Sequence, residues 1–106
     1  MNIKLSYLYR CYGNYKNANE VVFSNPDNLT IEEVATIIQS YLIDGEWFYA
    51  SKWDVSDMHF ERYDDELDHP YHEFGSLEFT EELSNDERSI TDFLRVVKSA
   101  GPHYIV

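Results

Sequence analysis

The chain has a single cysteine, Cys11, among its 106 residues. It therefore has no internal disulfide and no cysteine-rich zinc module. No stretch approaches the roughly 20 consecutive apolar residues that a membrane-spanning helix needs. The opening residues MNIKLSYLYR lack the apolar segment and the small-residue cleavage site of a secretory signal. We expect a cytoplasmic protein that does not contact a membrane.

Basic residues are also scarce, since eight lysines and arginines stand against 20 aspartates and glutamates, for a net charge of −12. Residues 54–92 carry the whole imbalance, with 14 acids against only Arg62 and Arg88. A nucleic-acid-binding surface needs a basic patch, and the sequence has none. The charge distribution argues against nucleic acid as a partner and favours a basic protein.

Apolar residues are plentiful at 43% of the chain, and aromatic residues make up 16%. A disordered segment would be poor in aromatic rings. A chain of this length can bury a modest core without a metal or a disulfide. We therefore expect one folded domain over residues 1–106.

The hydrophobic pattern predicts an α+β fold. Alternation of apolar and polar residues, the period of a half-buried strand, predicts a mainly antiparallel sheet of about five strands at residues 3–11, 20–24, 46–53, 58–63 and 72–80. Helical spacing predicts two helices over this sheet, at residues 30–43 and 88–100. The element order is ββαβββα, with the last two strands paired as a hairpin.

Three local signals refine this prediction. Thr30 is expected to cap the first helix, because a threonine followed three residues later by a glutamate forms a capping box. Ser89 or Ser84 is expected to cap the second helix. Gly75 lies inside a strand pattern, where glycine often marks a β-bulge.

Several aromatic residues of the first and third predicted strands are expected to share one face of the sheet: Tyr7, Tyr9, Trp47, Tyr49 and Trp53. Two interpretations follow. The rings pack beneath the helices as core, or they form an exposed face through which two copies of the chain associate.

The most unusual segment is YDDELDHPYHEF, residues 63–74. Imidazole and carboxylate groups are ligands for divalent transition metals, and the candidates here are His69, His72, Asp65, Asp68 and Glu73. The two histidines are three residues apart and Pro70 follows the first, which argues against the helical histidine pair of zinc proteases. A loop-borne metal site, and with it a metal-dependent enzyme using residues 64–73, is the alternative interpretation.

The favoured interpretation is a non-enzymatic binding module that docks a basic partner, similar in kind to immunity or inhibitor proteins. Carboxylates steer a basic partner and rings provide desolvated anchors. The docking residues expected in the segment are Asp64, Asp65, Glu66, Asp68, Tyr71 and Phe74. No motif in the chain provides a nucleophile or an oxyanion hole. A solvated acidic turn without a partner is the third interpretation.

Four stretches together, SNPDNLTIEE, YDDELDHPYHEF, the EFT that follows, and DERSITDFL, resemble a small family of uncharacterised bacterial proteins of about this length. The family carries a Y-D-x-E-x-D-H-x-x-H-E-F core. The resemblance implies a bacterial, cytosolic origin. It implies no activity, so it assigns no role to any residue.

Overall fold

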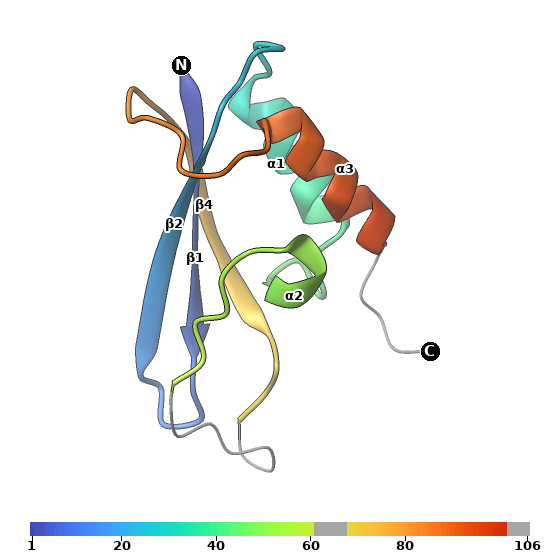
Figure 1. Cartoon of the computed structure of the whole chain (residues 1–106). Coiled ribbons are helices and arrows are strands. Elements are labelled where there is room, and N and C mark those ends of the chain that lie inside the picture. The colour runs from blue at the N-terminus through green and yellow to red at the C-terminus, as the bar shows by residue number, and fades with distance from the viewer. Residues whose placement is uncertain (61–67, 102–106) are drawn as a thin grey trace.

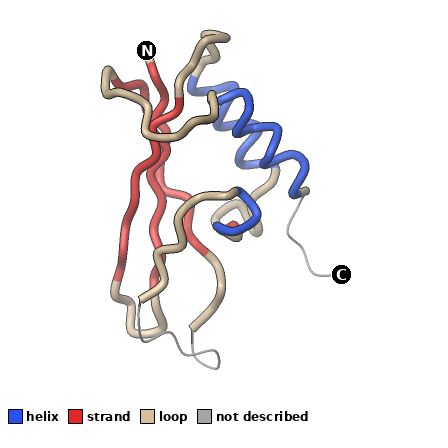
Figure 2. The backbone as a smooth tube through the Cα atoms, viewed as in Figure 1, coloured by secondary structure: helices blue, strands red, loops and turns tan. Residues whose placement is uncertain are grey.

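A computed structural model of the chain describes residues 1–60 and 68–101. It confirms the α+β class. Four strands form one antiparallel sheet in the order β2-β1-β4-β3, and three helices accompany it (Figures 1 and 2). In chain order the elements are β1 (Asn2–Arg10), β2 (Lys16–Phe23), α1 (Ile31–Ser40), β3 (Trp47–Phe48), α2 (Ala50–Trp53), β4 (His72–Thr80) and α3 (Ile90–Ala100).

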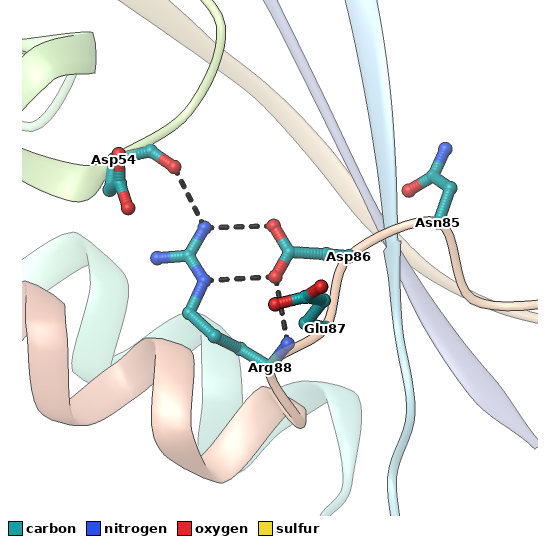
Figure 3. A pocket seen from close by; sticks show the side chains of 5 residues that line it. All are labelled: Asp54, Asn85, Asp86, Glu87 and Arg88. Atoms are coloured by element: carbon teal, nitrogen blue, oxygen red, sulfur yellow. Dashed lines mark hydrogen bonds and ion pairs between the residues drawn. The ribbon is translucent and has the colours of Figure 1, made fainter.

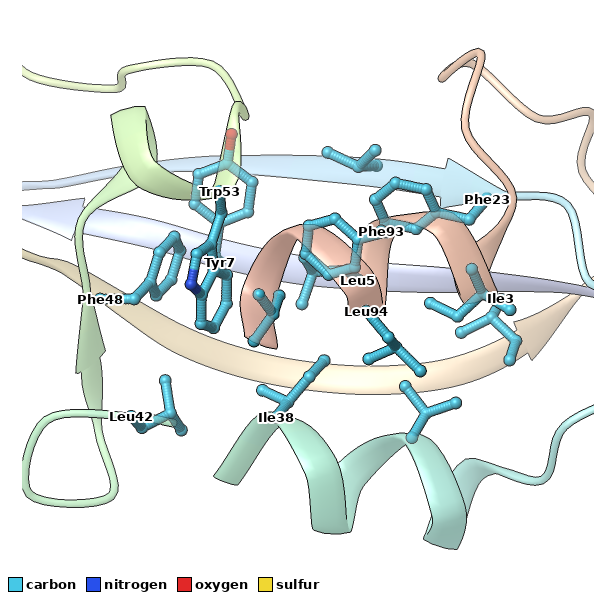
Figure 4. Packing of buried hydrophobic residues seen from close by; sticks show 14 of the residues in the cluster. Ile3, Leu5, Tyr7, Phe23, Ile38, Leu42, Phe48, Trp53, Phe93 and Leu94 are labelled. Carbon is cyan, nitrogen blue, oxygen red and sulfur yellow. The ribbon is translucent and has the colours of Figure 1, made fainter. Parts of the chain in front are cut away.

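The two faces of the sheet differ as the alternation in β1 predicts. Ile3, Leu5, Tyr7 and Tyr9 point toward the helices and are at most 1% exposed. Figure 4 shows Ile3, Leu5 and Tyr7 packed with helix residues in the core. Trp53 is also buried, so three of the five rings predicted to share a face belong to the core. Tyr49 is half-buried. Trp47 is half-buried too, and it pairs with Glu73 of the opposite face, so the five rings do not share one face.

The opposite face of the sheet is polar. Lys4 forms ion pairs with Glu82, Glu20 and Glu78. Arg10 forms two hydrogen bonds with the carboxylate of Glu73, at 2.7 and 3.1 Å. Long side chains of opposite charge therefore cover the sheet where no described helix lies.

The two longer helices begin where the sequence predicts. Thr30 Oγ1 accepts a hydrogen bond from the backbone N–H of Glu33 at 3.1 Å, and Ser89 Oγ accepts one from the N–H of Asp92 at the same distance. These bonds satisfy backbone donors that have no partner within the helix. Ser89, not Ser84, is the cap of α3, and Gly101, with φ of 72°, follows the last residue of this helix.

Residues 46–53, predicted as one strand, divide into the short strand β3 and the helical turn α2. The rings of Phe48 and Trp53 stack with centroids 4.2 Å apart, and both are fully buried. In an extended strand these residues would lie on opposite faces and about 16 Å apart. Burying both rings in one core therefore requires the chain to turn back, which overrides the alternating pattern.

Residues 58–60 are not in a strand, and residues 61–63 of the predicted fourth strand lie outside the described residues. The strand predicted to complete this hairpin, β4, pairs instead with β1, over seven residues of β1, and with β3 along its other edge. The described part of the sheet therefore has four strands instead of about five.

No helix in the described part of the chain is long and apolar enough to span a bilayer.

The predicted bulge is present at Gly75. Ser6 pairs with Ser76 and the next residue, Tyr7, pairs with Phe74, so Gly75 is the extra residue on β4. A Cβ atom at Gly75 would lie 2.7 Å from the backbone oxygen of Ser6. The two backbones approach so closely here that only glycine fits without displacement of the central strand.

We expect Gly75→Ala to lower the free energy of unfolding by about 1–3 kcal/mol, because the added methyl group collides with backbone instead of a flexible side chain. Urea unfolding followed by circular dichroism measures the change. Ser76→Ala, an exposed neighbour on the same strand, is the control and should change stability by less than about 0.5 kcal/mol. Equal stability of the two variants would contradict the close approach.

Candidate functional site

The structure separates the residues that the motif at residues 63–74 places together in sequence. Asp64, Asp65 and Glu66 lie outside the described residues. His72 and Glu73 begin β4 and therefore point to opposite faces of the sheet. His72 enters the core, 1% exposed, whereas Glu73 pairs with Arg10 on the polar face. The Arg10 guanidinium holds the pKa of Glu73 below its usual range.

Asp68, Tyr71 and Phe74 contact other parts of the protein. Asp68 Oδ1 accepts a hydrogen bond from the backbone N–H of Tyr12 at 2.7 Å. Tyr71 packs edge-on against the ring of Tyr49 at 5.1 Å, and its N–H donates to His69 Nδ1 at 3.2 Å. Phe74 is half-buried against the core. The predicted ring anchors, Tyr71 and Phe74, are thus partly committed to packing inside the protein.

Three histidines surround the buried ring of Tyr9. The centroids of His59, His69 and His72 lie 4.3, 5.3 and 5.3 Å from the Tyr9 centroid. The Tyr9 hydroxyl donates to the backbone oxygen of His69 at 2.8 Å. Tyr9 of β1 thus brings together imidazoles from the chain after α2 and from the start of β4.

Hydrogen bonds also hold the segment after α2 against the sheet, where it runs toward the β1–β2 hairpin (Figure 2). The Tyr7 hydroxyl donates to the Ser56 backbone oxygen at 2.7 Å. Asn17 Nδ2 donates to the Met58 oxygen at 3.1 Å. These bonds fix the backbone on both sides of Asp57.

Asp57, His59 and His72 form a compact group, because one ligand-type atom from each lies within 4.8 Å of the others. His59 Nδ1 is 2.8 and 2.9 Å from the two carboxylate oxygens of Asp57. His72 Nε2 is 3.5 Å from Asp57 Oδ1. The side chain of His72 is buried, that of Asp57 is 62% exposed, and that of His59 lies between them at 23%. The group therefore runs from the core to the surface.

His72 is neutral near pH 7. Burial, followed by the effect of the neighbouring His59, lowers the pKa of His72 to about 4, although Asp57 acts in the opposite direction. The backbone N–H of Met58 donates to His72 Nε2 at 2.9 Å, so the ring proton is assigned to Nδ1. No described residue accepts a hydrogen bond from this buried Nδ1.

Of the five metal ligands predicted from the sequence, only His72 belongs to this group among the described residues. Sequence reasoning missed Asp57 and His59, which lie in the stretch DVSDMHF. The only signal was an aspartate two residues before a histidine, a pattern too short to predict a site by itself.

A second feature is the outer edge of β2, which lies at one of the two edges of the described sheet. The backbone N–H and C=O of Val22 point outward and bond to Asn85, at 2.8 and 3.0 Å. The C=O of Ser24 accepts a bond from the N–H of Ile90 at 2.7 Å. The segment before α3 therefore covers this edge at Val22 and Ser24, near the end of β2.

Farther along the strand no described residue pairs with the edge, and we call this stretch the open edge. Alternate residues of an edge strand direct their backbone N–H and C=O groups away from the sheet. Ala18 and Glu20 alternate with Val22, so their backbone groups also point outward. No hydrogen bond from a described residue reaches the backbone N–H or C=O of either residue at this edge. Their side chains are exposed as well.

Acidic hollows flank this open edge. One of about 430 Å³ includes Glu20 and Glu82 in its lining, and another of about 280 Å³ includes Glu20, Asp54 and Asp86. A third of about 320 Å³ adds Glu87. All three hollows share Asn85. We call the carboxylates that line them the acidic edge: Glu20, Asp54, Glu82, Asp86 and Glu87.

Among the described residues that line the three hollows, Arg88 alone is cationic, and its guanidinium is already engaged (Figure 3). It forms a two-bond pair with Asp86, each bond 2.9 Å long, and it donates to the backbone oxygens of Trp53 and Asp54. The pair holds the pKa of Asp86 below its usual range. Arg88 thus ties α2 to the segment before α3. Lys4 pairs with Glu20 and Glu82, and the five carboxylates outnumber these two cations, so the charge around the hollows is negative.

Comparison with known proteins adds no assignment: no family model, no curated protein and no solved structure matches the chain. The resemblance to a small bacterial family therefore stays a prediction.

Proposed function

We propose that the protein is a non-enzymatic binding module, in the manner of an immunity or inhibitor protein, that docks a basic protein partner. The observation that carries this proposal is the open edge of β2 at Ala18 and Glu20, which lies between hollows lined by carboxylates. An open edge presents unpaired donors and acceptors to which another chain can add a strand. The acidic edge selects a strand that carries lysine or arginine.

The backbone and the side chains contribute differently to such a complex. Hydrogen bonds to the outward groups of Ala18 and Glu20 provide affinity that does not depend on the partner's side chains. Carboxylates around the edge accelerate association with a basic segment and disfavour an acidic one. Asn85 ends the open stretch, because it already occupies the edge at Val22.

The backbone contribution can be tested with a labelled peptide of about eight residues that alternates lysine and valine, a length typical of one strand. Ala18→Pro removes the outward N–H, and edge strands tolerate proline where the N–H faces solvent. We expect Ala18→Pro to weaken peptide binding about tenfold relative to Ala18→Val, which keeps the N–H. Fluorescence anisotropy measures the affinity, and a peptide of the same composition interrupted by proline is the negative control. Equal affinity of Ala18→Pro and Ala18→Val would refute strand addition at this edge.

The charge contribution is tested separately. Glu20→Lys with Glu87→Lys should slow association with the same peptide and reduce its salt dependence. Glu32→Lys with Glu46→Lys makes the same charge change at other exposed positions and should have a smaller effect. A third variant replaces Asp64, Asp65 and Asp68 with lysine. It tests whether the loop predicted from the sequence is the docking surface. If only the loop variant slows association, the docking surface is the loop and not the acidic edge.

A further inference from the structure

We propose that Asp57, His59 and His72 bind a zinc ion. These residues come from two segments, the chain after α2 and the first residue of β4, and they converge with their ligand-type atoms within 4.8 Å of one another. Two imidazoles and one carboxylate are a ligand set that suits zinc. The site is separate from the acidic edge and does not depend on the proposed protein partner.

The distances are close to those that zinc requires. Zinc–nitrogen and zinc–oxygen bonds of about 2.0–2.1 Å in a tetrahedron place neighbouring ligand atoms about 3.3 Å apart. His72 Nε2 and Asp57 Oδ1 are already 3.5 Å apart. His59 Nδ1 and the Asp57 carboxylate, at 2.8 Å, need to separate by about half an ångström. Because the Asp57 side chain is largely exposed, it has room for this movement.

The hydrogen bonding of the two imidazoles also leaves nitrogen atoms that can bind a metal. His72 is neutral, and its Nε2 carries a lone pair that now accepts only the N–H of Met58. Zinc would take the place of that N–H as the partner of Nε2. Zinc bound to His59 Nδ1 would likewise replace the contact between this nitrogen and the Asp57 carboxylate.

The surroundings limit the affinity and define the coordination. The Nδ1–H of His72 has no acceptor in the described part of the chain, whereas strongly bound zinc sites orient each imidazole through such an acceptor. We therefore expect weaker binding than in a four-ligand structural site. Three protein ligands, one of them exposed, leave a fourth position for water or for a ligand from solution.

The test is titration of metal-free protein with zinc chloride, followed by calorimetry. Cobalt(II) absorption provides an independent readout of tetrahedral coordination. Asp57→Asn and His59→Gln should each weaken zinc binding at least about tenfold. His69→Gln is the matched control, since His69 also contacts the Tyr9 ring but lies outside the group, and it should bind zinc within about twofold of the wild type. Melting curves confirm that each variant is folded. Asp57→Asn is the substitution least expected to disturb the fold, because the side chain of Asp57 is exposed.

Two results would overturn the proposal. One is binding of less than about half an equivalent of zinc to folded wild-type protein, because a formed site takes up one ion per chain. The other is a loss in His69→Gln as large as the loss in His59→Gln. That result would assign the metal to the ligands predicted from the sequence around residues 65–73 instead of to Asp57 and His59.

Discussion

Trp53→Ala is expected to lower the free energy of unfolding by about 3–5 kcal/mol, the range for removing a large buried aromatic side chain. Trp53 is fully buried. Its ring stacks on Phe48 at 4.2 Å and meets Phe93 edge-on at 5.8 Å, so its loss leaves a cavity between β3 and α3. Urea unfolding followed by far-ultraviolet circular dichroism measures the effect without relying on tryptophan fluorescence.

Lys52→Ala is the control, because Lys52 lies in the same short helix and is exposed. We expect a change below about 0.5 kcal/mol for this variant. A loss of less than about 1 kcal/mol in Trp53→Ala would show that α2 does not hold the segment after it against the core. Such a result would also remove support for the zinc site, whose Asp57 and His59 are positioned by that segment.

Acidification is expected to destabilise the metal-free protein through His72. The pKa of this residue is about 4 in the folded protein and about 6.5 in the unfolded chain. Between these values the unfolded chain binds more protons than the folded protein, so stability falls as pH falls. The contribution of His72 is fully present above about pH 6.5, and about 2 kcal/mol is lost by pH 5 and about 3 kcal/mol by pH 4.

His72→Gln isolates this contribution, because glutamine does not titrate and its side-chain oxygen can accept the N–H of Met58 in place of Nε2. Wild-type and variant stabilities, measured by urea unfolding in chelator between pH 7 and pH 4, should converge as pH falls. Asp57, His59 and His69 surround His72 and are present in both proteins, so they largely cancel in the comparison. Stability curves that stay parallel over this range would contradict a buried neutral His72.

The two proposals share one structural dependence. Asp54, at the end of α2, lines the acidic edge, and Asp57 follows three residues later in the zinc group. Arg88 donates to the backbone oxygens of Trp53 and Asp54 and so fixes the start of this segment. Any substitution that detaches α2 from the core should therefore weaken both peptide binding and zinc binding. Asp57→Asn should weaken zinc binding alone.

Local features of the fold could be predicted because each depends on neighbouring residues. Alternation in β1 identified the buried face, and hydrogen-bonding side chains at Thr30 and Ser89 marked the starts of α1 and α3. Gly75 marked the bulge in β4 because only glycine allows the approach of Ser6. The excess of carboxylates over residues 54–92 was likewise visible from composition alone.

The positions of the residues in the zinc group and at the β2 edge depended on tertiary structure. The sequence by itself determined the α+β class, the helix starts and the negative charge, because propensity, periodicity and charge are properties of short segments. Only packing decided that Phe48 and Trp53 stack, that the chain turns at α2, and that Asp57 and His59 consequently reach His72. Packing also left the β2 edge at Ala18 and Glu20 without a partner in the described part of the chain. Contacts between distant residues follow from which large rings share the core, and no local pattern in the sequence encodes that choice.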